Sequence, residues 1–206
     1  MCIRDRAITV NVTDVNEAPV FTSSATFTAA ENQTAINTVT ASYVGGENVT
    51  FTVSGSELAI TSAGILTFAS APNYETKSSY SATVTASDGT NTSTQAITVN
   101  VTDVNEAPVF TSPATFSVAE NQTAINTVTA TDVDGDNVTF TVSGSELAIT
   151  SAGVLTFASA PDYETKSTYT ATVTASDGTN TSTQAITGNV TGVNEGPIFT
   201  SAATLT

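Results

Sequence analysis

The residues of this chain that could do chemistry are its carboxylates, which gather in five short strings. Sixteen of the 19 acidic residues lie in strings reading D-V-N-E, A-E-N, D-V-D-G-D, D-Y-E and S-D-G, or in close variants of them. Clustered carboxylates repel each other and destabilise a compact state unless a cation neutralises them. Calcium suits such clusters, because it takes about six to eight oxygen ligands from carboxylates, amides and backbone carbonyls. The strings therefore predict calcium binding.

The strings recur because the chain is a tandem repeat. The sequence D-V-N-E-A-P begins at Asp14 and again at Asp103, and the variant G-V-N-E-G-P begins at Gly192, each 89 residues after the last. Two whole repeats follow, 18–106 and 107–195, which differ at 13 of 89 positions and align without a gap. Equal length without gaps predicts the same loops in both repeats, and an array of similar domains.

The remaining segments are interpreted from the phase of the repeat. Residues 7–17 correspond to the last strand and linker of a preceding repeat, and 196–206 to the start of a following one. Residues 1–6 read M-C-I-R-D-R, depart from the repeat and hold the only Cys and Met. They are interpreted as a cloning, assembly or sequencing artefact. The chain is therefore expected to be a fragment of a larger protein.

Composition excludes several classes of function. Outside the hexapeptide there is no Cys, His, Trp or Met, which excludes disulfides, thiolate metal sites and His-dependent catalytic triads. The net charge of −15 argues against nucleic acid and anionic membranes as partners. No apolar run is long enough for membrane insertion. Paired carboxylates could serve a glycosidase, but no insertion forms a cleft around them, so we expect no enzyme.

The pattern of each repeat predicts an all-β fold. Residues 80–86 and 97–101 alternate apolar side chains with Ser, Thr or Asn, as half-buried strands do. Five further short strands are predicted in the first repeat, at 26–29, 36–41, 49–54, 58–61 and 65–68. About seven such strands in 89 residues predict an antiparallel, seven-stranded Greek-key β-sandwich. Six aromatic residues are expected in its core: Phe21, Phe27, Phe51, Phe68, Tyr74 and Tyr80. The acidic strings then fall in loops at the two ends of the sandwich.

Five of these strings, in the same order and at a fixed period, resemble the cadherin-type repeat, in the variant common in large bacterial surface proteins. Glu31 and Glu120 match the family's first-loop glutamate. Its D-R-E string is matched by N-Y-E at 73–75 and D-Y-E at 162–164, its linker by D-V-N-E-A at 103–107, its D-x-D by Asp132-Val-Asp134, and its late A-x-D by A-S-D at 86–88 and 175–177. The likeness covers residues 7–206.

The resemblance implies where calcium binds. In the family, ions lie between successive domains and take ligands from both domains and the linker. The implied ligands around the linker at 103–106 are Glu31, Asn73, Glu75, Asp103, the Val104 carbonyl, Asn105, Glu106, Asp132, Asp134, Asn137 and Asp177. We expect two or three calcium ions there.

The acidic strings at the start of the first repeat and at the end of the second repeat depart from the family pattern. In the first repeat, Tyr43 and Gly45 replace the D-x-D pair, and Gly192 replaces the linker aspartate at the third copy. We expect these ends to bind calcium weakly or not at all in this chain.

The implied function is a calcium-binding extracellular repeat that acts in cell adhesion or as a rigid stalk of a large cell-surface protein. Calcium would be its cofactor. Other copies of the parent protein or cell-surface glycans would be its partners. Whether adhesion is direct or the array is a spacer stays open. The alternative is a carbohydrate-binding β-sandwich module, which requires a row of exposed aromatic side chains.

Overall fold

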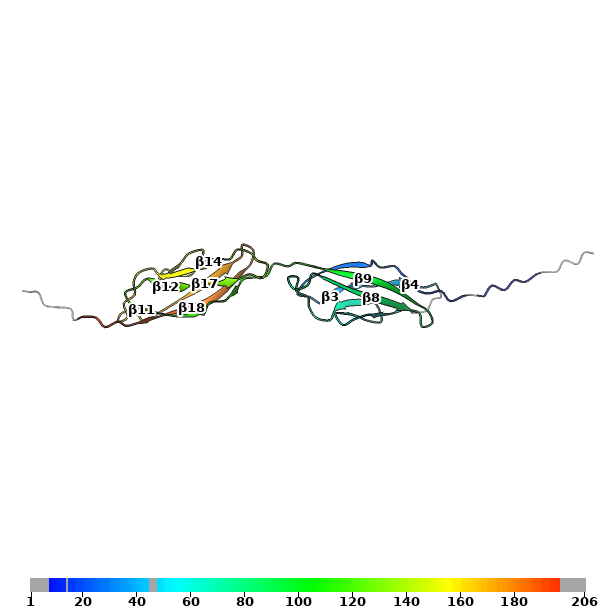
Figure 1. Cartoon of the computed structure of the whole chain (residues 1–206), viewed down its shortest axis with the longest axis horizontal. Helices are drawn as coiled ribbons and strands as arrows, with labels where there is room; N and C mark the ends of the chain where they lie inside the picture. Colours follow the sequence, from blue (N-terminus) through cyan, green and yellow to red (C-terminus); the bar gives the residue numbers. More distant parts are fainter. Residues whose placement is uncertain (1–7, 14, 45–47, 197–206) are drawn as a thin grey trace, which may run out of the picture. The chain divides into compact units, whose positions relative to one another are not determined.

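The computed structural model of the chain describes residues 8–13, 15–44 and 48–196. These residues form strands and no helix, and therefore no helix long and apolar enough to cross a membrane. Contacts divide the chain into two compact units, 1–104 and 105–206, which repeat one order of strands (Figure 1). The all-β prediction is confirmed. The hexapeptide interpreted as an artefact lies outside the described residues.

Among the described residues, each unit contains nine strand segments. Those of the first unit are β1 (Val20–Phe21), β2 (Thr26–Ala30), β3 (Ala35–Thr38), β4 (Ala41–Ser42), β5 (Thr50–Val53), β6 (Leu58–Ile60), β7 (Ile65–Phe68), β8 (Ser79–Ser87) and β9 (Thr92–Thr102). Those of the second are β10 (Val109–Phe110), β11 (Thr115–Ala119), β12 (Ala124–Thr127), β13 (Ala130–Thr131), β14 (Thr139–Val142), β15 (Leu147–Ile149), β16 (Val154–Phe157), β17 (Thr168–Ser176) and β18 (Thr181–Thr191).

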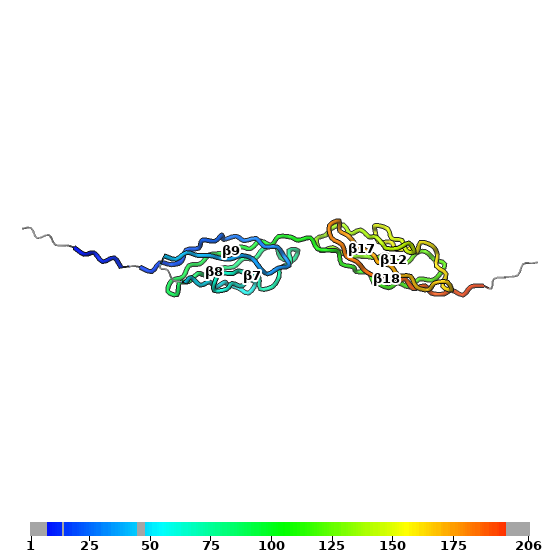
Figure 2. Tube along the Cα trace, turned by 180° about the vertical axis from the view of Figure 1, so that it is seen from behind, coloured from blue at the N-terminus to red at the C-terminus, as the bar shows by residue number. Residues whose placement is uncertain are grey.

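The strands of each unit form two main sheets around one core. In the first unit the four-stranded sheet has the order β2-β9-β8-β5 and the three-stranded sheet the order β3-β7-β6, while β1 pairs with β4. Figure 2 shows β7, β8 and β9 from behind. The second unit repeats this arrangement with β11-β18-β17-β14 and β12-β16-β15. Side chains of both sheets, among them Leu66, Phe68, Val84 and Ile97, join one buried cluster.

One pairing departs from the antiparallel prediction. β2 runs parallel to β9, with Thr26 opposite Thr98 and Ala30 opposite Thr102. A parallel pair needs a long crossover connection, and here the whole chain between the two strands supplies it. Alternation along a single strand does not reveal the direction of its neighbour, so this pairing was not predicted.

The alternation of the two long strands is confirmed. In β9, Ile97, Val99 and Val101 are buried, while Asn100 between them is exposed. This follows from the two-residue period of a strand, which turns successive side chains to opposite faces. Of the six aromatic residues expected in the core, the prediction for Tyr74 is wrong. Tyr74 lies in the loop before β8 and is 37% exposed.

The strand predicted at 36–41 is two strands, β3 and β4. Between them the chain leaves the sheet at Val39, which is fully buried and donates its N–H to the Gly64 carbonyl at 2.8 Å. Gly64 has a φ of +89°, and a Cβ there would lie 2.2 Å from the Val39 carbonyl oxygen. Only glycine accommodates both the positive φ and this approach.

Gly188 in β18 occupies the position of the fully buried Val99 in β9. A Cβ at Gly188 would make ordinary contacts of 3.7–3.9 Å with Phe157 and the Tyr169 carbonyl. A Val side chain has therefore room to enter, and its absence costs packing and chain entropy of about 2–4 kcal/mol.

We therefore expect the second unit to melt first, and Gly188→Val to raise its free energy of unfolding by about 2–4 kcal/mol. Calorimetry of the whole chain measures both transitions. The matched change Val99→Gly should lower the transition of the first unit instead. Melting temperatures that neither substitution changes would contradict this account.

Candidate metal centre

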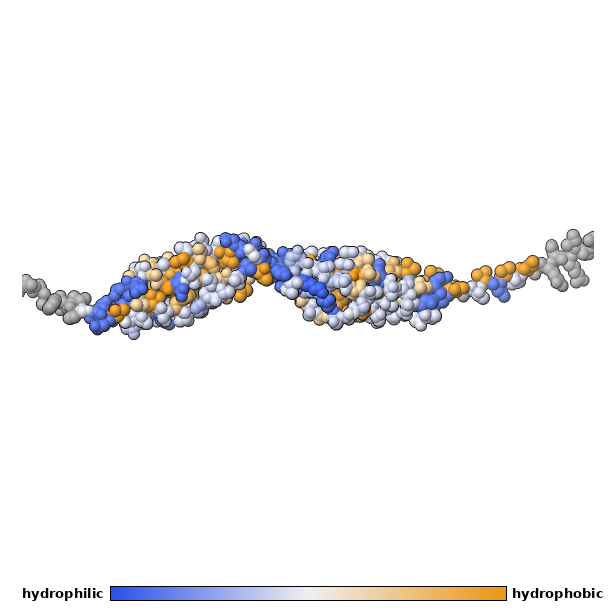
Figure 3. Space-filling model, in the orientation of Figure 1, coloured by the Kyte–Doolittle hydropathy of each residue, from blue (hydrophilic) through white to orange (hydrophobic). Residues whose placement is uncertain are grey.

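The strand order gathers the acidic strings at the two ends of each unit. Because β2 and β9 are parallel, Glu31 after β2 and Asp103 after β9 leave the sheet at the same end. β8 is antiparallel to β9, so Glu75, in the loop that enters β8, belongs to that end too. The turn from β8 to β9, with Asp88, is at the other end. Figure 3 shows hydrophilic residues gathered toward the ends of each unit.

Three carboxylates converge at the end of the first unit that contains the last residue of β9. Glu31, Glu75 and Asp103 each place an oxygen within 4.8 Å of the others. Glu31 is the buried member, 3% exposed. Its Oε2 accepts the N–H of Tyr74 and its Oε1 the N–H of Val104, both at 2.9 Å. These hydrogen bonds hold a buried carboxylate in place, and the three carboxylates together form an anionic site.

The lysines are engaged elsewhere. Lys77 pairs with Glu57, and Lys166 with Glu146, both at 2.5 Å and both over a tyrosine ring. Neither glutamate belongs to the five strings. The arginines lie outside the described residues. No lysine therefore neutralises the carboxylate clusters in the described part of the chain.

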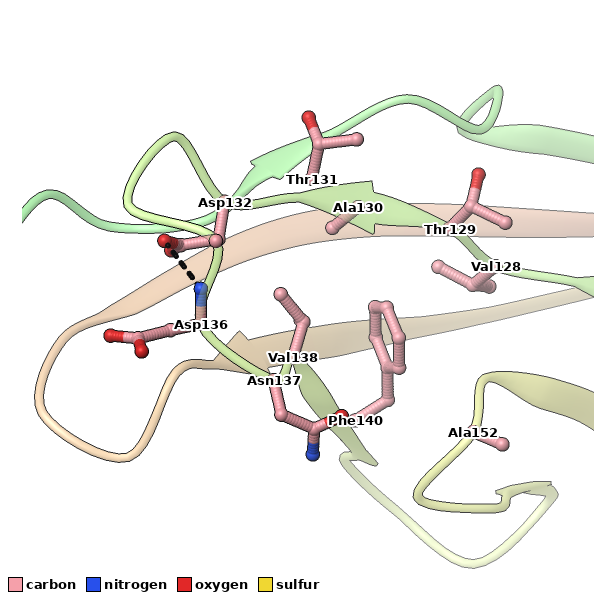
Figure 4. A pocket seen from close by; sticks show the side chains of 11 residues that line it. Val128, Thr129, Ala130, Thr131, Asp132, Asp136, Asn137, Val138, Phe140 and Ala152 are labelled. Carbon is pink, nitrogen blue, oxygen red and sulfur yellow. Dashed lines mark hydrogen bonds between the residues drawn. The ribbon is translucent and has the colours of Figure 1, made fainter. Parts of the chain in front are cut away.

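The second unit presents the D-x-D loop at the end that contains the turn from β17 to β18. Asp132 Oδ1 accepts the N–H of Asp134 at 3.0 Å. It also accepts the N–H of Asp136 at 3.3 Å, the bond drawn in Figure 4. Asp134 Oδ2 accepts the N–H of Glu106 at 2.9 Å. The other two oxygens, Asp132 Oδ2 and Asp134 Oδ1, are buried and accept no hydrogen bond. Buried anionic oxygens without a donor are costly, and a bound metal ion would satisfy them. The donor set is all oxygen and fits calcium.

Asp177 completes this end. Its Oδ1 accepts the N–H groups of Thr179 and Asn180 at 2.6 Å each, and its Oδ2 accepts Asn105 Nδ2 at 2.9 Å. Desolvation raises the pKa of Asp177, but the hydrogen bonds from Thr179, Asn105 and Asn180 outweigh it and lower the pKa below its usual 3.8. The carboxylate is therefore held ionised, as a calcium ligand must be.

The remaining candidate ligands are less well placed. Asn73 Oδ1 accepts the N–H of Thr76 at 2.8 Å, so this oxygen stabilises the local turn. Asn137 turns its amide away from the carboxylates of Asp132 and Asp136 in Figure 4. The Val104 N–H is used by Glu31, which leaves its carbonyl as the candidate ligand. The assignment of these residues as ligands stays a prediction.

The end of the second unit where β18 finishes brings together more carboxylates than the sequence pattern suggested. Glu120, Asp162 and Glu164 place oxygens within 4.8 Å of one another, although Gly192 supplies no side chain. Asp162 stands where the first repeat has Asn73, and this exchange was the signal that could have predicted the cluster. The Tyr163 ring lies only 3.0 Å from the position a Cβ at Gly192 would take.

The end of the first unit that contains the turn from β8 to β9 has different side chains at the place of the D-x-D loop. Tyr43, in place of Asp132, donates its hydroxyl to Asn16 Oδ1, the amide oxygen that corresponds to that of Asn105. Asn16 is otherwise held as Asn105 is, with its Nδ2 on Asp88 Oδ2 at 3.3 Å. A neutral hydroxyl thus replaces a carboxylate at this end. Asp14 and Glu47, which belong to the same strings, lie outside the described residues.

Two asparagines that the sequence reasoning missed hold the linker. Asn91 Nδ2 donates to the Asn16 carbonyl at 2.8 Å, and Asn180 Nδ2 to the Asn105 carbonyl at 2.7 Å. The Asn180 contact, with that of Glu106 to Asp134, places Asn105 and Glu106 in the second compact unit. Their signal was the recurrence of S-D-G-T-N in both repeats.

Exposed aromatic side chains are few in the part of the chain that the structure describes. Tyr74 and Tyr163, one in each repeat, are the aromatic residues more than a third exposed, at 37% and 43%. One ring per repeat makes no row, so the structure does not favour the carbohydrate-binding alternative.

Known sequences of two kinds are similar to this chain, a bacterial domain family and animal cadherins. Residues 105–189 match the family described as a bacterial Ig domain. Mouse cadherin EGF LAG seven-pass G-type receptor 1 is 37% identical over 125 residues, 55% of this chain. Human cadherin EGF LAG seven-pass G-type receptor 2 is 34% identical over 195 residues, 83% of this chain. The chain spans only 4% and 7% of the length of these relatives.

Solved structures show the same fold. The EC1-2 structure of human protocadherin-24 (form II) matches with a TM-score of 0.64 and 20% identity, over 88% of this chain and all of that one. Drosophila N-cadherin EC1-4 matches with a TM-score of 0.61 and 22% identity, over 87% of this chain and 50% of that one.

Acid should weaken the turn around Asp88. The Asn91 N–H chiefly lowers its pKa below 3.8, against desolvation and with help from Thr90 and Asn16. A carboxyl whose folded pKa is depressed adds stability above its unfolded pKa, and that stability is lost as pH falls through the folded pKa. NMR titration of the Asp88 carboxyl carbon should give a midpoint below 3.8. Asp88→Asn should destabilise at about pH 6 but not at about pH 2. A midpoint at or above the usual value would contradict the assignment.

Proposed function

Since the two units are cadherin-like repeats, we propose that the chain is a calcium-binding module of an extracellular protein. Calcium bound by the linker at 103–106 and by residues beside it stiffens the array. It works mechanically, by cancelling the repulsion between carboxylates and by fixing the linker.

The observation that carries the proposal is the pair of buried oxygens, Asp132 Oδ2 and Asp134 Oδ1, that accept no hydrogen bond. The other oxygen of each carboxylate is occupied by a backbone N–H, which aims the side chain. The lysines are paired elsewhere. A hard cation with a high coordination number supplies what these oxygens lack.

Covalent connection supports a role for the linker. Asp103 belongs to the carboxylate cluster of the first unit and Asn105 to the loop cluster of the second. Two residues of chain span at most about 7 Å, so both groups of ligands attach to one short segment. An ion that took ligands from both groups would remove the freedom of that segment. The linker has no Gly in 103–107, so little flexibility has to be lost.

The proposed setting is the cell surface. The relatives are named as cadherins, protocadherins and receptors, and we extend from them an extracellular location and contact with other copies of the parent protein. We propose no catalytic activity, because the acidic clusters sit at strand ends and have the character of metal ligands rather than of an acid–base pair in a cleft.

Calorimetric titration tests calcium binding. We expect dissociation constants of about 0.1–1 mM or tighter, typical of calcium sites in extracellular modules. Asp134→Asn, which keeps the shape and one acceptor but removes the charge, should weaken binding at least about tenfold. Glu57→Gln is the matched control, since it also removes one negative charge but lies outside the strings. No heat of binding at millimolar calcium would sink the proposal.

Stiffening is tested separately by small-angle scattering. The calcium-loaded chain should give the profile of a rigid particle, and chelation should give that of a more flexible one. Asp134→Asn should resemble the chelated chain throughout. A wild-type profile that does not change on chelation would leave calcium binding possible but remove its mechanical role.

A further inference from the structure

We infer that Asn180 is a positioning residue for the calcium ligands of the second unit, an inference that rests on the proposed function. It lies in the turn from β17 to β18 and holds the linker by its side chain, while its backbone holds a candidate ligand. It need not touch the metal itself.

The contacts of Asn180 converge on one peptide group. Its Nδ2 donates to the carbonyl oxygen of Asn105 at 2.7 Å. The N–H on the other side of that planar peptide bond, that of Glu106, donates to Asp134 Oδ2 at 2.9 Å. The 105–106 peptide is therefore held at both its polar atoms by side chains of the second unit. Since a peptide bond is planar, two such contacts fix its orientation.

The same residue also organises Asp177. The Asn180 N–H donates to Asp177 Oδ1 at 2.6 Å, and Asp177 Oδ2 accepts Asn105 Nδ2 at 2.9 Å. Asn180, Asp177 and Asn105 thus form a closed ring of hydrogen bonds. Because Asn105 Nδ2 also donates to the Glu106 carbonyl at 3.1 Å, its Oδ1 is the amide atom that remains for a metal.

The first unit provides an internal comparison. Asn91 makes the same contact, with its Nδ2 on the Asn16 carbonyl at 2.8 Å and its N–H on Asp88 Oδ1 at 2.7 Å. There, however, Tyr43 replaces the first D-x-D aspartate and donates its hydroxyl to Asn16 Oδ1. The anchor is thus present in both repeats, but only the second repeat joins it to the carboxylates of a D-x-D loop.

A role in metal binding follows from this difference. Hydrogen-bond partners that orient metal ligands commonly affect affinity by about 10–100-fold when they are removed. Asn180 orients three candidate ligands, namely Asn105, Glu106 and Asp177, whereas Asn91 has no D-x-D loop to serve.

The experiment compares Asn180→Ala with Asn91→Ala in the whole chain. Calcium binding is measured by calorimetry, and amide hydrogen exchange at Glu106 by NMR in calcium-free buffer. We expect Asn180→Ala to weaken calcium binding about tenfold and to speed exchange at Glu106, and Asn91→Ala to do neither. Thermal unfolding of both variants is followed in parallel. A residue that only stabilises its own turn would lower the melting temperature and speed exchange at Thr179 without reaching Glu106.

The outcomes separate the two proposals. Calcium affinity within twofold of wild type in Asn180→Ala, or an equal loss in Asn91→Ala, overturns the positioning role. If the wild-type chain binds no calcium, the proposed function fails, and exchange at Glu106 alone decides whether Asn180 anchors the linker. Unchanged exchange at Glu106 overturns the anchor itself.

Discussion

The buried carboxylate of Glu31 is the contact on which the organisation of each repeat depends. One side chain, placed directly after β2, receives the N–H of Tyr74 from the loop that enters β8 and the N–H of Val104 from the residues that follow β9. It therefore ties three distant stretches of chain at one end of the sandwich. Glu120 repeats both contacts with Tyr163 and Val193. Burial of a charge is expensive, so this arrangement requires the donors around it and draws further positive charge.

The ends of the two repeats share this frame but differ in what they can bind. In the second repeat, Asp132 and Asp134 each have a buried oxygen that accepts no hydrogen bond. At the corresponding place in the first repeat, the Tyr43 hydroxyl donates to the side-chain amide of Asn16. At the end of each repeat where its last strand finishes, the carboxylate cluster differs in one member. Asp103 belongs to the cluster of the first repeat, and Asp162 to that of the second. Five of the 13 substitutions between the repeats thus lie at the acidic ends, while the hydrogen-bond frame of Glu31 and Glu120 is the same in both.

Much of the fold could be predicted, because the residues of β8 and β9 alternate over a length that leaves little ambiguity. β1 and β4 could not, since two residues carry no period, and the parallel partner of β9 is set by the path of the whole chain. Of the candidate ligands, Glu31, Glu75, Asp103 and the D-x-D pair are brought into clusters. Asn137 and Asn73 are not, because local turns decide where a short amide points. Asn180 escaped prediction because its role is to donate a hydrogen bond rather than to supply a ligand.

The parallel pairing of β2 with β9 has a consequence under tension. A repeat pulled by its two ends is loaded at the start of β2 and at the finish of β9, which are neighbours with the same direction. The pull then acts along both strands in opposite senses and shears their register from Thr26–Thr98 to Ala30–Thr102 as a whole. In an antiparallel pair loaded at the same end, hydrogen bonds would break one after another. The sheet therefore resists force with its full ladder at once, and this property belongs to the topology rather than to any ion.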